Sequence, residues 1–259
     1  MAENENGNEL ETLEKGNIYF FYRPRVEEED PEGKSDVQRF YMVLNPEDPK
    51  ERFRLAIIGR KKLPKPERAG KARDWGFVDM VRKDPKSIRE ALSEENYRTK
   101  TRGERHNPAA RPCGEGVYRI LRHEDHTHLV YLLELPKSED AVQDELGIEE
   151  EASYIISVKN PERGGPRAAG LKEERQAEYP KSLQEIFRDR KFADADPPDF
   201  LNHEGTEFLL IGASGDPKEE LGITLNAEKE SKHSADVFKQ MGIDKSERPV
   251  KPLFEGEWA

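Results

Sequence analysis

The chain has 259 residues, of which 34% are hydrophobic and 37% are charged, and its formal net charge is −11 at pH 7. No stretch approaches eighteen consecutive apolar residues, which excludes a transmembrane helix. The single cysteine, Cys113, excludes intrachain disulfides and cysteine-rich zinc modules. The first residues are acidic and lack the apolar core of a secretory signal. We therefore expect a soluble cytoplasmic protein with a lean core and long polar loops.

Charge is distributed unevenly along the chain. Residues 1–49 contain 13 acidic and 5 basic side chains, and residues 50–111 contain 9 acidic and 19 basic ones. Residues 112–259 contain 32 acidic and 19 basic side chains. The overall negative charge thus hides a basic middle between two acidic flanks. Such asymmetry favours contact with a polyanion through the middle segment.

Three short strands are predicted in the first part of the chain. Residues 1–15 are polar and acidic, and we expect them to be disordered. The apolar runs 18–22, 40–44 and 53–58 read as strands that end at turn-forming residues. The loops between them are too short for crossover helices, so the pairing is expected to be antiparallel.

A loop, a strand and a helix follow. The basic, proline-containing loop 60–73 leads to a loosely alternating strand at 75–81. Asp84 can cap the first turn of the next helix, and Pro85 suits its first position. The apolar stripe of that helix consists of Ile88, Ala91 and Leu92.

The clearest hairpin pairs residues 117–121 with residues 129–135 around a turn at Glu124-Asp125. The later predicted elements are an acidic helix at 138–146, a strand at 154–158, a helix that begins at Ser182, a strand at 208–211 and a weak helix at 234–241.

Residues 16–58 contain a glycine followed by three predicted strands, and residues 116–158 contain the same order. This repetition indicates two similar halves. The alternative is a chance resemblance, because short apolar strands look alike. We therefore predict an α+β fold, mainly antiparallel β-sheet, with two similar β-rich halves, a few short helices and long polar loops. The predicted divisions are a disordered acidic N-terminus at 1–15, a β-rich half with basic loops at 16–100, a second β-rich half with short helices at 101–226, and a tail with one weak helix at 227–259.

Three histidines surround the turn of the predicted hairpin. His126 and His128 are two residues apart, so they share one face of a strand, and His123 stands across the turn from them. Three converging imidazoles would suit Zn²⁺ and leave a fourth position for water and hydrolytic chemistry. The alternative is that polar residues simply cover the exposed tip of a hairpin.

The basic middle carries the candidate ligand-binding residues on two loops, 60–73 and 99–116, with the aromatic residues Trp75, Phe77 and Tyr97 interleaved. Cationic side chains on loops beside a sheet supply phosphate contacts, and aromatic rings stack on unpaired bases. The alternative is that these cations pair with the acidic flanks of the same chain or with an acidic partner. The candidate residues are Arg60, Lys61, Lys62, Arg102, Arg105 and Arg111.

One weak family resemblance points the same way. The segment Glu14–Tyr22, followed by Ile57–Gly59, resembles small PUA-like barrels that read modified bases. Only 12 of the 259 residues carry this resemblance, and the long acidic loop between them departs from the compact pattern. The resemblance favours nucleic-acid binding and transfers no site residue.

The leading hypothesis is a non-enzymatic binding protein whose basic central loops contact a nucleic acid, a nucleotide or an acidic partner. The first alternative is a metal-dependent hydrolase that uses the histidine hairpin. The second is a pure protein-interaction protein that binds through its acidic ends and through Phe254 and Trp258 in its tail.

Overall fold

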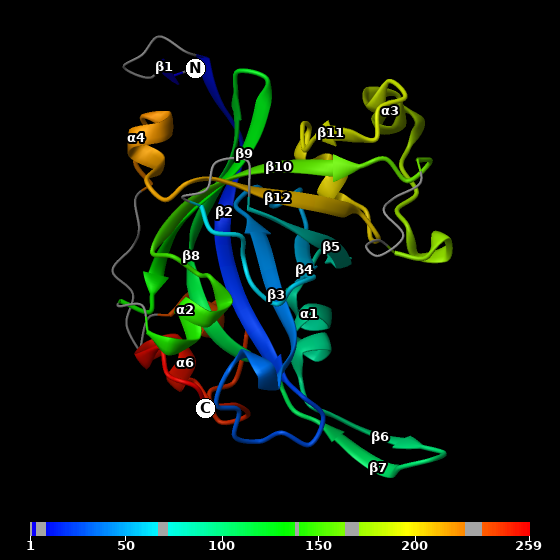
Figure 1. The fold of residues 1–259 in the computed structure, drawn as a ribbon, viewed down its shortest axis with the longest axis vertical. Coiled ribbons are helices and arrows are strands. Elements are labelled where there is room, and N and C mark those ends of the chain that lie inside the picture. The colour runs from blue at the N-terminus through cyan, green and yellow to red at the C-terminus, as the bar shows by residue number, and fades with distance from the viewer. Residues whose placement is uncertain (1, 4–8, 67–71, 138–139, 164–170, 226–234) are drawn as a thin grey trace.

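A computed structural model describes all residues except 1, 4–8, 67–71, 138–139, 164–170 and 226–234. Eight antiparallel strands form a closed barrel (Figure 1). Around the barrel their order is β2 (Glu9–Pro24), β3 (Val37–Pro46), β4 (Phe53–Ile58), β5 (Arg73–Arg82), β12 (Glu207–Ser214), β10 (Glu151–Lys159), β9 (His126–Leu135) and β8 (Arg111–His123), and β8 pairs back onto β2.

The predicted α+β fold with two similar halves is wrong. The described part of the chain is mostly antiparallel β-structure, with 42% of its residues in strands and 20% in helices, and eight of its strands form one barrel. The strands of the two predicted halves are joined along two seams, β2 with β8 and β5 with β12, so they enclose a single core. Both seams connect segments that are distant in the sequence, and a strand's sequence pattern does not identify such a partner.

Short elements surround the barrel. Strands β1 (Ala2–Glu3) and β11 (Phe192–Asp194) extend it, and β6 (Glu95–Thr99) pairs only with β7 (Gly103–Asn107). The α-helices are α1 (Pro85–Leu92), α2 (Ala141–Leu146), α3 (Lys181–Gln184), α4 (Pro217–Leu221), α5 (Asp236–Lys239) and α6 (Lys251–Glu255). The 3-10 helices are η1 (Lys34–Asp36), η2 (Glu173–Arg175), η3 (Glu185–Phe187) and η4 (Pro198–Asn202).

Side chains of β2 alternate between two hydrophobic clusters. Ile18, Phe20 and Tyr22 belong to the cluster that fills the barrel, whereas Tyr19 and Phe21 belong to a second cluster outside it. All five side chains are buried, because residues on a strand point alternately to its two faces and both faces are covered here. The barrel interior is therefore a packed core.

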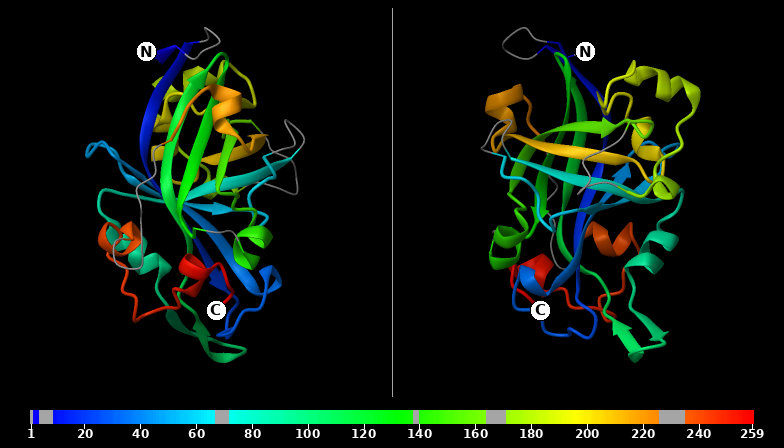
Figure 2. Two further views of the ribbon diagram at one scale, coloured as in Figure 1. Left: turned by 90° about the vertical axis from the view of Figure 1, so that its left-hand side faces the viewer. Right: turned by 45° about the vertical axis from the view of Figure 1, so that its right-hand side comes forward.

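Helices cover the outer cluster. Ile88 and Leu92 of α1, Val237 of α5 and Leu253 of α6 are buried against it. The sequence-predicted cap of α1 is confirmed, because the Asp84 side chain accepts a hydrogen bond from the backbone N–H of Lys86. Figure 2 shows these helices grouped at the end of the barrel where the C-terminus lies.

Two glycines allow close approach between neighbouring strands, Gly16 of β2 toward β3 and Gly116 of β8 toward β9. A Cβ atom on Gly16 would lie 2.1 Å from the carbonyl oxygen of Asn45, and one on Gly116 would lie 2.1 Å from that of Leu132. Only glycine fits such an approach.

The ends of the chain pack on the body. Strand β2 begins at Glu9 and so includes the second part of the segment 1–15 that we expected to be disordered. The ring of Trp258 meets that of Tyr22 edge-on, with 5.0 Å between centroids. No helix in the described part of the chain is long and apolar enough to cross a membrane.

Candidate functional site

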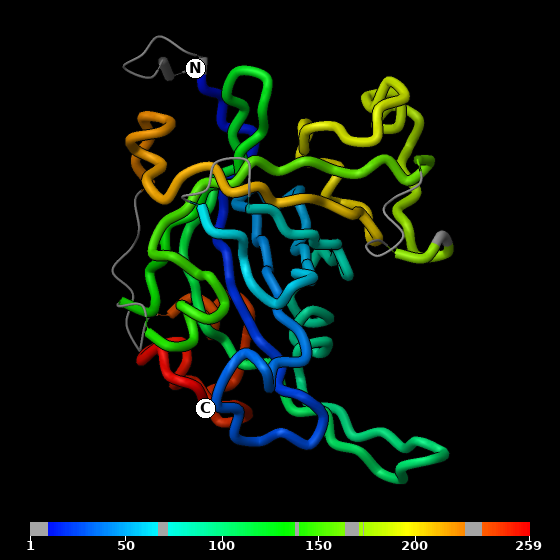
Figure 3. Tube along the Cα trace, in the orientation of Figure 1, coloured from blue at the N-terminus to red at the C-terminus, as the bar shows by residue number. Residues whose placement is uncertain are grey.

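The hairpin formed by β6 and β7, which we call the arm, lies apart from the barrel. The two strands pair from Glu95 with Asn107 to Thr99 with Gly103, and Gly103 adopts a left-handed φ of 72° at the turn. Figures 1 and 3 show the arm extending from the end of the molecule where α1 and the C-terminus lie. The chain enters the arm from α1 and leaves it into β8.

Two buried arginines bind the backbone at the root of the arm, by which we mean the residues just before β6 and just after β7. Arg23 of β2 donates hydrogen bonds to the carbonyl oxygens of Ser93 at 3.0 Å and Pro108 at 2.5 Å. These two residues lie on opposite sides of the hairpin, so one guanidinium ties its entry to its exit. Its other terminal nitrogen donates to the carbonyl oxygen of Ala91 at 2.7 Å. An arginine can serve several acceptors at once because its guanidinium is a planar fork of five donors.

The second arginine is Arg248, from the segment that follows α5. Its Nη1 donates to the carbonyl oxygens of Leu92 at 3.3 Å and Ala110 at 3.0 Å, which again lie on the two sides of the arm. Burial lowers the pKa of Arg248, partly offset by Glu247, and the positive charge of Arg23 lowers it further. The root therefore contains two buried cations whose hydrogen-bond acceptors are mostly backbone carbonyls.

The acidic loop that follows β2, residues 25–33, contacts one side of the arm. The side chain of Glu27 accepts a hydrogen bond from the backbone N–H of His106 at 2.8 Å and lies 3.3 Å from Nε of Arg105. The side chain of Glu29 lies 3.1 Å from Nε2 of His106. The carbonyl oxygen of Glu29 accepts a hydrogen bond from Arg111 at 2.7 Å. Two predicted ligand-binding residues, Arg105 and Arg111, thus contact the chain's own acidic segment.

Arg111 is a structural residue in this arrangement. It is 2% exposed, and burial lowers its pKa, while Tyr22 and the acidic loop act in the opposite direction. Within the described residues, its Nε and Nη1 have no hydrogen-bond partner. A side chain this buried cannot contact a large external ligand.

The tip of the arm, residues 97–102, differs from the sides of the arm in the ion pairs that its cations form. Arg98, Lys100 and Arg102 are exposed, and they form no ion pair with any residue that the structure describes. Glu104 is opposite Arg98 in the strand register. Tyr97, which precedes Arg98, is 37% exposed, and it is the one large hydrophobic residue classed as exposed in the described part of the chain.

The other predicted cations lie on the loop between β4 and β5. Nε of Arg60 is 3.0 Å from Oδ1 of Asp74, and Nζ of Lys61 donates to the carbonyl oxygen of Val37. Burial comes first among the factors that lower the pKa of Lys61, followed by repulsion from Arg25 and Lys34. Lys62 is half-buried. Of the three, Arg60 and Lys61 therefore contact groups of the protein itself.

The three histidines do lie near one another at the β8–β9 turn. The rings of His123 and His128 are 5.8 Å apart, and His126 is opposite His123 in the register. Nδ1 of His128 is 3.0 Å from Oγ of Ser153. Burial, followed by repulsion from the other two histidines, lowers the pKa of His128 to about 4.

Proximity does not bring these histidines into a metal-binding arrangement. Across the described residues, no group of three or more His, Cys, Asp or Glu side chains is placed to hold a metal ion. His126 is half exposed, and its closest acidic neighbours are Asp125 and Asp194, each 4.0 Å away. The zinc site at His123, His126 and His128 stays a prediction that the positions of these side chains do not support.

Of the residues that form or hold the arm, Arg102 and Arg105 were predicted from the sequence as ligand-binding residues. The others were not. Arg98 and Lys100 carry the same charge signal as Arg102 and could have been included with it. Arg23 and Arg248 could not, because one is a single cation within an apolar strand and the other precedes a proline in the tail. Their role depends on packing between distant segments.

Comparison with known protein families, with curated proteins and with solved structures finds no match.

Proposed function

We propose that this chain is a non-enzymatic binding protein whose arm contacts unpaired nucleic acid. The observation that carries the proposal is the tip of the arm, where three unpaired cations adjoin an exposed tyrosine. Lysine and arginine side chains neutralise phosphates, and an aromatic ring beside them offers a stacking surface for a base. The combination favours a single-stranded polyanion with bases over an acidic protein.

The root of the arm supports the same proposal. Arg23 and Arg248 are buried with few carboxylate contacts, which is an unfavourable environment for a charge unless hydrogen bonds compensate. Those hydrogen bonds connect both sides of the arm to β2 and to the C-terminal segment. A hairpin held in this way is presented in a fixed direction, and a preorganised surface loses less entropy when it binds.

Salt-dependent binding tests the proposal. Fluorescence anisotropy would measure the affinity of the full chain for a labelled 12-nucleotide oligouridine between 50 and 200 mM salt. The variant R98E/K100E/R102E should bind at least about 10-fold more weakly. Its slope of log affinity against log salt should be less steep by about 2, since each phosphate contact with a single strand contributes about 0.7.

A matched control separates the arm from overall charge. The variant K50E/K172E/K191E reverses three exposed lysines outside the arm and gives the same net charge. It should lose much less affinity than the arm variant. Equal losses in the two variants would contradict the proposal, as would absence of binding by the unaltered chain at 50 mM salt. Equally tight binding of polyglutamate would assign an acidic protein partner instead.

A further inference from the structure

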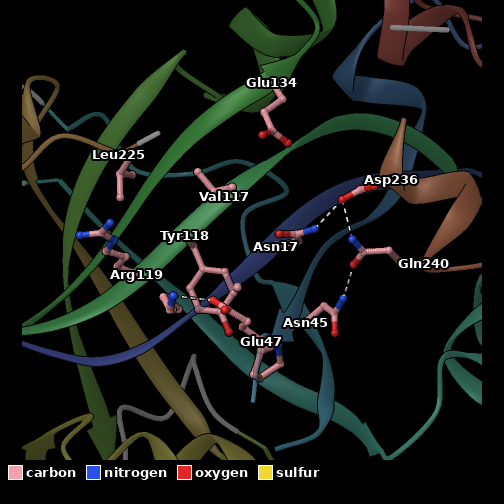
Figure 4. A pocket seen from close by; sticks show the side chains of 13 residues that line it. Asn17, Asn45, Glu47, Val117, Tyr118, Arg119, Glu134, Leu225, Asp236 and Gln240 are labelled. Atoms are coloured by element: carbon pink, nitrogen blue, oxygen red, sulfur yellow. Dashed lines mark hydrogen bonds and ion pairs between the residues drawn. The ribbon is translucent and has the colours of Figure 1, made fainter. Parts of the chain in front are cut away.

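A second region of interest is a polar groove of about 530 Å³ that is independent of the arm. Strands β2, β3, β8 and β9 and the segment around α5 line it. In Figure 4 the side chain of Arg119 lies on one side of this groove, and a connected set of Asn17, Asp236, Gln240 and Asn45 lies on the other. Its volume is in the range typical of small-molecule sites.

Two cations, Lys15 and Arg119, line the groove together with the carboxylates of Glu47, Glu134 and Asp236. Lys15 of β2 is directly opposite Arg119 of β8 in the strand register, and like charges in that position repel each other. Glu47 offsets one of the two charges, because its carboxylate is 2.7 Å from Nζ of Lys15. Arg119 is half-buried and forms no hydrogen bond or ion pair anywhere in the described part of the chain. An anion bound beside Arg119 would relieve this repulsion.

The opposite side is a row of hydrogen-bonding groups. The amide of Asn17 donates to Asp236 at 2.7 Å, that of Asn45 donates to Gln240 at 2.6 Å, and the amide of Gln240 donates to Asp236 at 2.5 Å. These contacts fix both asparagine side chains. The amides of Asn17 and Asn45 also hydrogen-bond the phenol of Tyr19, so each carboxamide still offers its oxygen as an acceptor within the described residues.

We propose that the groove binds a mononucleotide, with the phosphate at Arg119 and the base at the carboxamides of Asn17 and Asn45. Guanidinium groups bind phosphate through paired, charge-assisted hydrogen bonds. The oxygen of such a carboxamide accepts a hydrogen bond from the exocyclic amino group on one edge of adenine. Val117 and Leu225 supply apolar contact between the two ends.

Calorimetric titration of the full chain with three probes tests this assignment. Adenosine 5′-monophosphate should bind, adenosine should bind at least about 10-fold more weakly, and inorganic phosphate should bind more weakly still. The variant R119A should reduce the affinity for the monophosphate to that for adenosine and leave adenosine binding unchanged. N45A should weaken the binding of both. R102A, on the arm, is the control and should change neither affinity.

Several results would overturn the assignment. These are absence of binding of the monophosphate to the unaltered chain, an unchanged affinity in R119A, or phosphate binding as tightly as the monophosphate. Thermal unfolding of each variant checks that it is folded, and R119A removes no side-chain hydrogen bond or ion pair within the described residues. Oligouridine binding by R119A should remain normal, so failure here is distinguishable from failure of the arm.

Discussion

Arg23 and Arg248 come from opposite ends of the chain, yet their guanidinium groups bind carbonyl oxygens on both sides of the same hairpin. Arg23 joins Ser93 to Pro108, and Arg248 joins Leu92 to Ala110. A backbone hydrogen bond of 2.8 Å from Ala110 to Leu92 closes the root between them. The direction of the arm is therefore fixed by a barrel strand and by the C-terminal segment together.

Replacement of Arg248 by methionine should loosen the root. Methionine fills a similar volume but leaves the carbonyl oxygens of Leu92 and Ala110 without this donor. Relief of the buried charge offsets part of the loss, so we expect the free energy of unfolding to fall by about 1–3 kcal/mol. Urea denaturation measures the fall, and hydrogen exchange should accelerate across residues 94–107. R102M, at an exposed position, should change neither quantity, and unaltered exchange in R248M would show that the root does not depend on Arg248.

Replacement of Glu27 by glutamine should strengthen nucleic-acid binding. Glutamine retains an acceptor for the backbone N–H of His106 but removes the charge that pairs with Arg105. Arg105 then adds to the positive charge of the arm. The pair is partly exposed, so the free energy of unfolding should change by less than about 1 kcal/mol. Anisotropy with labelled oligouridine should show an increased affinity and a steeper salt dependence, and a decreased affinity would exclude this role for Glu27.

Removal of the tyrosine ring should weaken binding without changing its salt dependence. The variant Y97A loses a stacking surface worth about 1–3 kcal/mol per base, which corresponds to roughly 5- to 150-fold in affinity. The slope against salt should be unaltered because no phosphate contact is lost. Y97F, which keeps the ring, should bind nearly as well as the unaltered chain. If Y97A and the unaltered chain bound with equal affinity, stacking on Tyr97 would not contribute to binding.

The stability of the fold should depend on pH through His128. Its pKa is depressed to about 4 in the folded chain, so folding favours the neutral imidazole. The resulting stabilisation is complete above the ordinary histidine pKa of about 6.5 and is lost as pH falls from there towards 4. It amounts to at most about 3 kcal/mol. The neighbouring Glu220 acts in the opposite direction, because burial raises the pKa of its carboxyl group.

Comparison of unfolding at pH 7.5 and pH 5 isolates this contribution. The unaltered chain should lose more stability over that range than H128N, which keeps a polar group beside Ser153 but cannot titrate. H126N, at the half-exposed neighbour, should retain most of the pH dependence, because burial and not repulsion from His126 is the main cause of the lowered pKa of His128. Identical pH dependence in H128N and the unaltered chain would contradict the assignment to His128.

The sequence predicted individual elements better than their assembly. The hairpin at residues 117–135 and the capped helix at Asp84 depend on local patterns and are confirmed by the structure. Closure of the barrel depends on the pairing of β2 with β8, and neither strand carries a signal for its partner. The charge pattern marked the segment as basic, but the sequence predicted a loop at 99–116, where the structure has β7 and the start of β8. It could not separate the free tip from Arg105 and Arg111, because their acidic partners lie in a distant loop.

Photochemical cross-linking would show which residues of the chain contact the nucleic acid. A 12-nucleotide oligouridine containing 4-thiouridine would be irradiated with the full chain at 50 mM salt, and the cross-linked peptides would be identified by mass spectrometry. We predict that the main cross-links fall within residues 97–102, with Tyr97 as the principal site. The variant R98E/K100E/R102E should not form these cross-links. Cross-links concentrated elsewhere on the barrel, and unchanged in that variant, would contradict this prediction.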